Sequence, residues 1–502
     1  MSIVVEPSIL NSIRVSRFVS IVHITLGSST DGLKTNGTES LPNKSQLLAQ
    51  PWQVLALLTQ SENNANAEYW WKTTGSMLGI LMEEAGYDLQ SQYFGLIFHL
   101  HYINSRLGPA KSATAEKPTW RSFMTDDFSP LEYSWNWDTP KKGPKIRYAV
   151  EAIGPDAGSL KDPYNQNSTL ELCDQLRSAL PGTKFTLVDI LRDSFYDATP
   201  HRISQEMPAT RNSYWRKLKE RLRGSSTRKS MSSDSSGESA TRSVSEDLNH
   251  SSPSSIFLAF ELGSRIATKA YFVPVKAEQH GISRLEVLTG AIETLRKHGY
   301  PFEAYDKLLE FAKTDQGAKV DIIGLAIDCI DPEASRFKIY VRSPESSFRS
   351  VCEMMTLCGA IDSLSSTARS ELKDLWWSTL CLDPLLPESE ELKCNNHETA
   401  GVLYNFDIKP RGTSIEPKLY VPVRHFVRND YDAAQGLRAY LAARGKDRYF
   451  ANYMRALERS STHRSLKDGC GFQTYIGTGL QKDGSLALCS YINQEVYHSN
   501  RR

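Results

Sequence analysis

The sequence predicts an α+β protein in which about ten antiparallel strands close into a barrel with a polar lumen, surrounded by an outer ring of helices. A Lys-x-Tyr pattern occurs in three strand-like runs, at Lys269-Ala270-Tyr271, Lys338-Ile339-Tyr340 and Lys418-Leu419-Tyr420. The copies stand 69 and 80 residues apart, which suits one copy in each of several repeated units. Pairs of predicted strands alternate along the chain with pairs of predicted helices. This regular alternation also favours a sheet that closes into a ring.

The two faces of these strands differ in chemistry. Side chains alternate between the faces of a strand, so the Lys and the Tyr of each copy point the same way and the apolar neighbours point the other way. A sandwich keeps its inner face dry, whereas a barrel covered by helices can enclose a polar lumen. Several cations in one lumen would repel one another unless an anion, such as phosphate or diphosphate, lay among them. The alternative is that these are solvent-facing residues of ordinary strands.

The first part of the chain supplies a leader and the first unit. Residues 1–48 show little periodicity and are expected to be a poorly ordered leader, so one domain is predicted over 49–502. Apolar spacings of three and four predict two antiparallel helices. Next come two strands joined by a turn, then another helix, and then a segment whose pattern is also helical. The expected elements are helices at 68–86 and 89–107, the turn at 140–143, the helix at 168–180 and helical texture at 202–223.

A serine-rich stretch at about 224–255 interrupts the domain, and because its composition cannot bury apolar surface we expect a disordered insertion. After it, strand pairs and helix pairs alternate regularly. Strand pairs are expected at 256–275, 319–342, 401–424 and 470–497, with helices at about 284–299, 302–313, 347–358, 366–379, 431–444 and 447–459. The whole forms a single domain with its active site at the centre.

Composition excludes several classes of protein. The 502 residues carry a formal net charge of +1, without the basic stripe of a nucleic-acid binder. The eight cysteines show no CxxC spacing, which argues against zinc or redox motifs and favours a reduced, cytoplasmic setting. The apolar segment at 18–26 is too short to cross a bilayer. We therefore expect neither nucleic acid nor membrane as a partner. The expected partners are small molecules, and the sequence does not distinguish a monomer from a homodimer.

Glu132 is the carboxylate that the pattern singles out. In the run SPLEYSWNW, the residues Glu132, Ser134 and Asn136 share one face, and the aromatic residues share the other. Glu132 is therefore expected to face the lumen beside Arg147 of the neighbouring strand. It either forms a cross-strand ion pair of little consequence or accepts a hydrogen bond from an aromatic N–H or O–H.

The remaining candidates are cations and phenols. Basic residues that could hold a diphosphate are Arg147, Lys269, Arg336, Lys338 and Lys418. Phenol rings stabilise a cation over their faces and keep water away from it, which suits an allylic cation. The phenols that could do this are Tyr271, Tyr340, Tyr420, Tyr475 and Tyr491.

The sequence lacks the motifs of several other enzyme classes. It has no GxxxxGK[ST] loop, no GxGxxG after a strand, no HExxH and no GxSxG. It also lacks a DDxxD motif. The nearest matches are Asp126-Asp127 and Asp430-Tyr431-Asp432, which we interpret as acidic residues in a turn or at the start of a helix. None of the histidines pairs with a Cys or Asp at ligand spacing. We therefore predict no metal site and no cofactor.

The sequence resembles the indole prenyltransferases of the dimethylallyltryptophan synthase type. These enzymes act in fungal alkaloid biosynthesis and other secondary metabolism, and their fold is a ten-stranded αββα (ABBA-type) barrel. The similarity runs from about Trp70 to Tyr497. It is carried by the segments WWKTTGSMLGILMEEAGY, LGP at 107–109, SPLEYSWNW, KAYFVP, SRFKIYVRSP, PKLYVPVRH and GFQTYIGTG.

The resemblance implies an enzyme that transfers the dimethylallyl group of dimethylallyl diphosphate to an indole ring without a metal. By position, Glu132 is similar to the carboxylate that holds the indole N–H, and Phe123 and Met124 to residues that contact the acceptor's backbone. The five cations resemble the diphosphate ligands and the five tyrosines a shield around the allylic cation. Fixed cations would stabilise the departing charge without reorganising.

One departure concerns the acceptor. Family members that alkylate free tryptophan at C4 have a lysine where this chain has Ile256. The implied acceptor is then a tryptophan-containing cyclic dipeptide or a larger indole alkaloid, and the base that removes the final proton is unassigned. Two alternatives stay open: a phenolic or polyketide aromatic as acceptor, and a non-catalytic protein that binds isoprenoid diphosphates.

Overall fold

A computed structural model of the chain describes residues 50–61, 64–110, 118, 120–137, 143–197, 254–362, 364–393, 397 and 399–501. The expected leader at 1–48, the helical texture expected at 202–223, and the serine-rich insertion up to residue 253 lie outside the described residues. Predictions about those segments therefore stay predictions.

Ten antiparallel strands form a closed barrel, which confirms the predicted fold class. Each strand pairs with its neighbours in the sequence, and β1 closes the ring by pairing with β10, where Glu132 lies opposite Asn493. The strands are β1 Leu131–Asn136, β2 Lys145–Val150, β3 Ile256–Glu261, β4 Ala267–Phe272, β5 Asp321–Asp328, β6 Phe337–Ser343, β7 Val402–Ile408, β8 Glu416–Val421, β9 Gln473–Leu480 and β10 Leu486–Asn493.

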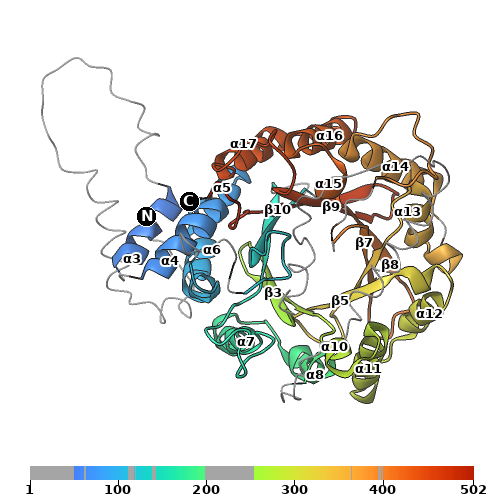
Figure 1. The fold of residues 1–502 in the computed structure, drawn as a ribbon, viewed down its shortest axis with the longest axis horizontal. Helices are drawn as coiled ribbons and strands as arrows, with labels where there is room; N and C mark the ends of the chain where they lie inside the picture. The colour runs from blue at the N-terminus through green and yellow to red at the C-terminus, as the bar shows by residue number, and fades with distance from the viewer. Residues whose placement is uncertain are drawn as a thin grey trace, which may run out of the picture.

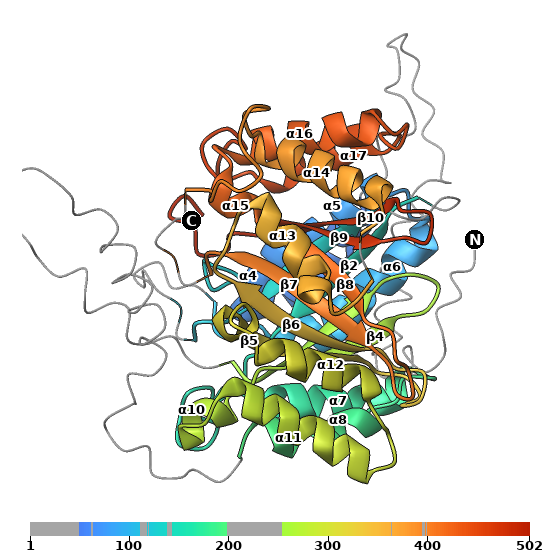
Figure 2. The ribbon, with the colours of Figure 1, turned by 90° about the vertical axis from the view of Figure 1, so that its right-hand side faces the viewer.

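Helices surround the barrel, as Figure 1 shows, and in the view of Figure 2 one group of them lies above the strands and another below. The first predicted helix is continuous through a π turn at Trp71–Gly75, and the second ends in another at His99–Ile103. The α-helices are α3 Pro51–Ser61, α4 Ala65–Trp70, α5 Ser76–Glu84, α6 Leu89–Phe98, α7 Asn167–Ala179, α8 Thr186–Phe195, α10 Lys276–His280, α11 Arg284–Lys297, α12 Glu303–Ala312, α13 Phe348–Met355, α14 Ser366–Leu380, α15 Val423–Phe426, α16 Asp430–Ala442 and α17 Phe450–Ser460.

The helix that follows α7 differs from the prediction. The second helix beside α7 is α8, which occupies Thr186–Phe195 rather than the segment at 202–223. Its apolar residues Leu187, Val188 and Leu191 are buried and its polar residues face outward, so the amphipathic pattern was present in the sequence. Among the helices of the described residues, none combines the length and the apolar character needed to cross a membrane.

The hydrophobic core lies between the outer face of the barrel and the helices. Tyr133 and Trp135 of β1 are fully buried there, as the strand alternation predicts. Ile256 of β3 is also fully buried in this outer core. Ile256 consequently does not face the lumen, whereas the next residue, Phe257, lines the cavity. The side chain at position 256 therefore packs in the outer core, and the acceptor inferred from Ile256 stays a prediction.

Candidate functional site

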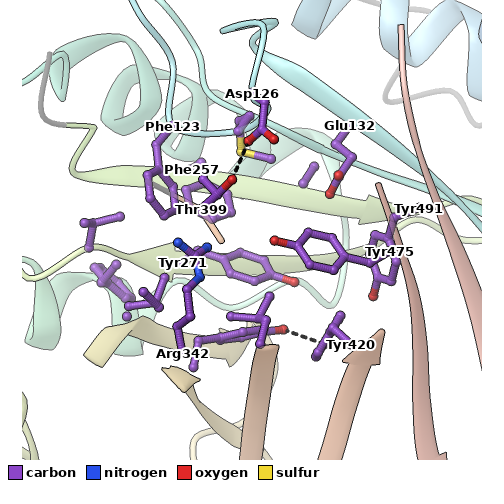
Figure 3. Close-up of a pocket in the computed structure, with 18 of the residues that line it drawn as sticks. Phe123, Asp126, Glu132, Phe257, Tyr271, Arg342, Thr399, Tyr420, Tyr475 and Tyr491 are labelled. Atoms are coloured by element: carbon purple, nitrogen blue, oxygen red, sulfur yellow. Dashed lines mark hydrogen bonds between the residues drawn. The ribbon is translucent and has the colours of Figure 1, made fainter. Parts of the chain in front are cut away.

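A cavity of about 910 Å³, including the part open to solvent, occupies one end of the barrel lumen. Figure 3 shows Glu132, Tyr475 and Tyr491 on one side of it and Phe123 and Phe257 on the other. Its remaining lining residues are Met124, Asp126, Ala149, Tyr271, Phe272, Val273, Ile323, Gly324, Leu325, Tyr340, Arg342, Thr399, Leu403, Tyr420 and Arg424. The cavity is thus largely apolar and aromatic, with a few polar groups, as small-molecule sites usually are.

The predicted tyrosines form a belt in this cavity. The ring centroids of Tyr271 and Tyr340 lie 5.9 Å apart, as do those of Tyr340 and Tyr420. Tyr420 in turn lies 5.6 Å from Tyr491 and 6.2 Å from Tyr475. Burial raises the pKa of Tyr271, Tyr340, Tyr420 and Tyr491 well above the usual value, so these phenols stay neutral. A belt of neutral rings can stabilise a cation while excluding water.

The predicted cations form a second layer of the lumen, next to the tyrosines. Lys269, Lys338 and Lys418 each lie two positions before a belt tyrosine on the same strand, and Arg147 lies two before Ala149 of the cavity wall. Arg336 precedes Lys338 by two positions in the same way. None of the five lines the cavity directly. The cations and phenols therefore lie in adjacent layers rather than in a single shell.

Carboxylates that the sequence analysis did not identify hold these cations in place. Lys338 Nζ lies 3.1 Å from Asp328 Oδ1, and Arg336 Nε lies 2.8 Å from Asp328 Oδ2. In the same way Arg147 pairs with Glu261 at 2.7 Å and Lys418 with Asp407 at 2.7 Å. Such pairing fixes the cations before a ligand arrives.

The charged residues of this layer shift one another's pKa values. Burial acts to raise the pKa of Asp328, but Lys338 and Arg336 outweigh it and hold that pKa far below the usual range. Burial lowers the pKa of Lys338 to about 8, and it also lowers the pKa of Lys269, helped by the charge of Arg147. A buried layer rich in basic groups suits a multiply charged anion, which would favour the protonated form of these lysines.

Glu132 faces the cavity, but its predicted neighbour is wrong. Its partner across the strand pair is Ala149, while Arg147 lies opposite Ser134 and is bound by Glu261. Glu132 Oε1 instead accepts a hydrogen bond of 2.7 Å from Thr474 Oγ1. Burial raises the pKa of Glu132 to about 7. The carboxylate is therefore available to hold an N–H or O–H of a bound ring.

Phe123 and Met124 line the same cavity, on a loop between the helical N-terminal part and β1. The backbone N–H of Phe123 donates to Ser254 Oγ at 2.9 Å, and that of Met124 donates to Ser122 Oγ at 3.2 Å. Both serine hydroxyls donate to the buried carboxylate of Glu151. This wall of the cavity is therefore fixed by a polar network beneath it.

Several cavity residues escaped the sequence analysis: Asp126, Phe257, Arg342, Thr399 and Arg424. Arg342 could have been found, because it follows Tyr340 by two positions on β6 and so shares its face. Asp126, interpreted from the sequence as a turn acid, lies 3.1 Å from Arg424 Nε and accepts a hydrogen bond of 3.0 Å from Thr399 (Figure 3). No local pattern joins Asp126 to Thr399 and Arg424, which lie more than 270 positions further along the chain.

Asp126, His397 and His425 form a group whose atoms could hold a metal ion, although no sequence spacing joins them. Asp126 Oδ2 lies 3.9 Å from a ring nitrogen of each histidine. The Arg424 guanidinium, however, lies 3.1 Å from the same Asp126 oxygen and 3.2 Å from His425 Nε2. A fixed positive charge therefore occupies the place where a metal cation would bind.

Comparison with known proteins agrees with this architecture. The chain is 31% identical over 476 residues to a prenyltransferase of Pestalotiopsis microspora, covering 90% of this chain and 94% of that protein. It is 30% identical over 468 residues to xanthone prenyltransferase B of Emericella nidulans, covering 90% and 92%. It is 32% identical over 455 residues to the 4-O-dimethylallyl-L-tyrosine synthase of Claviceps purpurea, covering 88% and 92%.

Solved structures show the same fold. The crystal structure of AnaPT from Neosartorya fischeri matches with a TM-score of 0.66 at 23% identity and covers 89% of this chain and 98% of that one. The structure of NotF in complex with brevianamide F and DMSPP also matches with a TM-score of 0.66, at 19% identity, covering 89% and 99%. The model of the family described as tryptophan dimethylallyltransferase matches residues 66–456. The chain therefore belongs to the tryptophan dimethylallyltransferase family and is an enzyme of the dimethylallyltransferase type.

Proposed function

We propose that this enzyme moves the dimethylallyl group of dimethylallyl diphosphate to an electron-rich aromatic ring whose polar hydrogen is held by Glu132. The observation that carries the proposal is the order of layers in the lumen: basic side chains, then the tyrosine belt, then Glu132 at the cavity wall. A diphosphate among the cations would place its isoprenoid inside the belt and the acceptor beside Glu132.

The chemistry follows from this order. The C–O bond to the diphosphate breaks and both electrons leave with the diphosphate, whose charge the fixed cations stabilise. The belt holds the allylic cation over neutral rings, and the acceptor ring supplies the electrons for the new C–C bond. Loss of the ring proton restores aromaticity. We propose that no metal takes part, since lysine and arginine side chains supply the positive charge.

An indole is the acceptor that the sequence predicts, and the place of Glu132 in the cavity wall supports it, because the ionised carboxylate can accept the indole N–H. A phenolic acceptor is the second candidate. It is favoured by relatives named for xanthone and tyrosine, at 30% and 32% identity. A phenol O–H could occupy the same place beside Glu132.

The test is a product assay with purified protein in EDTA. Dimethylallyl diphosphate is combined separately with L-tryptophan, a cyclic dipeptide of tryptophan and proline, L-tyrosine and 1,3-dihydroxyxanthone, and products are identified by mass spectrometry and NMR. A prenylated indole supports the first candidate, and a prenylated xanthone or tyrosine alone supports the second. Diphosphate binding without any prenylated product would contradict the proposed transfer.

A further inference from the structure

Arg424 is a buried arginine in the cavity wall for which the mechanism above has no role. It lies in α15, directly after β8, and is 9% exposed. Its Nη2 donates a hydrogen bond of 2.7 Å to the hydroxyl of Tyr475, and its guanidinium carbon lies 4.5 Å from the centre of the Tyr475 ring. Arg424 therefore holds both the hydroxyl and the face of one belt tyrosine.

Asp126 holds Arg424 from the other side, with Nε of the arginine 3.1 Å from Oδ2 of the aspartate. Burial acts to raise the pKa of Asp126, but the charge of Arg424 outweighs it and keeps that pKa below the usual value, so Asp126 is ionised. Asp126 Oδ1 also accepts the hydrogen bond from Thr399. A carboxylate with two such partners fixes the position of the guanidinium.

The loop that carries Asp126 also carries Phe123 and Met124 of the acceptor side. A continuous chain of contacts thus runs from the acceptor side of the cavity through Asp126 and Arg424 to Tyr475. We propose that Asp126 and Arg424 are positioning residues that hold Tyr475 in the belt and thereby keep water from the allylic cation. This inference rests on the proposed transfer reaction.

The position of Tyr475 should decide how the allylic cation divides between attack by water and attack by the acceptor ring. If Tyr475 moves, water can reach the cation: the C–O bond to diphosphate breaks as before, water forms the new C–O bond, and its extra proton passes to solvent. The product is dimethylallyl alcohol in place of the prenylated ring. The ratio of alcohol to prenylated product therefore reports how well the belt excludes water, which a purely structural role for Arg424 would not change.

The experiment compares Arg424→Met, Asp126→Asn and Tyr475→Phe with the unaltered protein. Each is incubated with dimethylallyl diphosphate alone, with L-tryptophan, or with 1,3-dihydroxyxanthone, and alcohol and prenylated product are both quantified. We expect the alcohol fraction, or the hydrolysis rate with donor alone, to rise about tenfold when the charge-assisted hydrogen bond to Tyr475 is lost. Tyr475→Phe removes the acceptor of that bond while leaving the pair of Arg424 and Asp126 intact, so it tests the same contact if Arg424→Met folds poorly.

Arg444→Met is the matched control. Arg444 lies over the Tyr440 ring at 3.7 Å and pairs with Glu371 at 2.6 Å, so it has the same kind of contacts, but in the outer helices. We expect its alcohol fraction to equal that of the unaltered protein. The double variant Arg424→Met/Tyr475→Phe should resemble the single variants, because both changes break one contact.

Unchanged partitioning and donor hydrolysis in Arg424→Met and Tyr475→Phe would overturn the inference. A raised acceptor KM with unchanged partitioning would also overturn it, and would make Arg424 a ligand of the acceptor instead. Failure of the unaltered protein to prenylate any tested ring would count against the proposed transfer, and the donor-alone arm would still test the role of Arg424.

Discussion

Thr474 and Glu132 are joined by a hydrogen bond of 2.7 Å that crosses from β9 to β1, residues 342 positions apart in the sequence. The bond occupies Oε1 of the carboxylate. Oε2 makes no hydrogen bond with any residue that the structure describes, so it is the oxygen that we expect to meet the acceptor. The position and the acidity of Glu132 both depend on this contact, and the first two predictions follow from it.

Glu132→Gln should lower turnover with an indole acceptor by about a hundredfold or more, because an amide is a weaker acceptor for the N–H than a carboxylate. The KM for dimethylallyl diphosphate should stay nearly constant, since Glu132 is bound by Thr474 and lies opposite Ala149, not Arg147. Steady-state kinetics with each substrate varied in turn checks both expectations. A large rise in donor KM would show that the variant disturbs the whole lumen.

The pH profile should show the ionisation of Glu132. Its pKa is raised to about 7, so the carboxylate is protonated below that pH and cannot accept the acceptor's hydrogen. We expect kcat/KM for the acceptor to fall about tenfold for each pH unit below 7. The bond from Thr474 acts to lower this pKa, so Thr474→Val should move the acidic limb to higher pH. An acidic limb that stays in place would contradict this assignment.

Lys338 should produce a second limb on the alkaline side. Its pKa is lowered to about 8 by burial, so the free enzyme loses this cation as the pH rises through that value. We expect kcat/KM for dimethylallyl diphosphate to decline above about pH 8. Lys338→Arg keeps its charge and should flatten this limb, whereas Lys338→Met should raise the donor KM at every pH. Equal profiles for all three proteins would argue against diphosphate contact.

Glu151 should matter for stability. It is fully buried and accepts hydrogen bonds from Trp120, Ser122, Ser254 and Asn165 at 2.9, 2.5, 2.7 and 3.1 Å.

Glu151→Ala leaves these donors without their acceptor and should cost about 3 kcal/mol of unfolding free energy. Glu310→Ala removes an exposed carboxylate that pairs with Lys313, the residue after α12, and should cost less than about 0.5 kcal/mol. Urea denaturation of both variants checks the difference, and a stability of Glu151→Ala close to that of the control would contradict it.

Much of the site could be predicted because strand alternation is local. Lys338 and Tyr340 share a face of β6 wherever that strand lies, so a repeated Lys-x-Tyr pattern gives the lining of a lumen. The rule was not applied to Ile256, whose position was assigned by similarity, and alternation gives its place on the outer face of β3. The sequence analysis also missed Arg342, two positions beyond Tyr340, although the rule applied there equally well.

The sequence by itself determined the barrel, the outer helices and the polar lumen, because these depend on periodicities within a few residues. Tertiary structure alone decided that Glu132 lies beside Thr474 and away from Arg147, that Asp328 holds Lys338, and that Asp126 meets Arg424. Those relations depend on strand register, burial and loop paths that bring distant residues together. The electrostatic environment that raises the pKa of Glu132 therefore exists only once the barrel has closed.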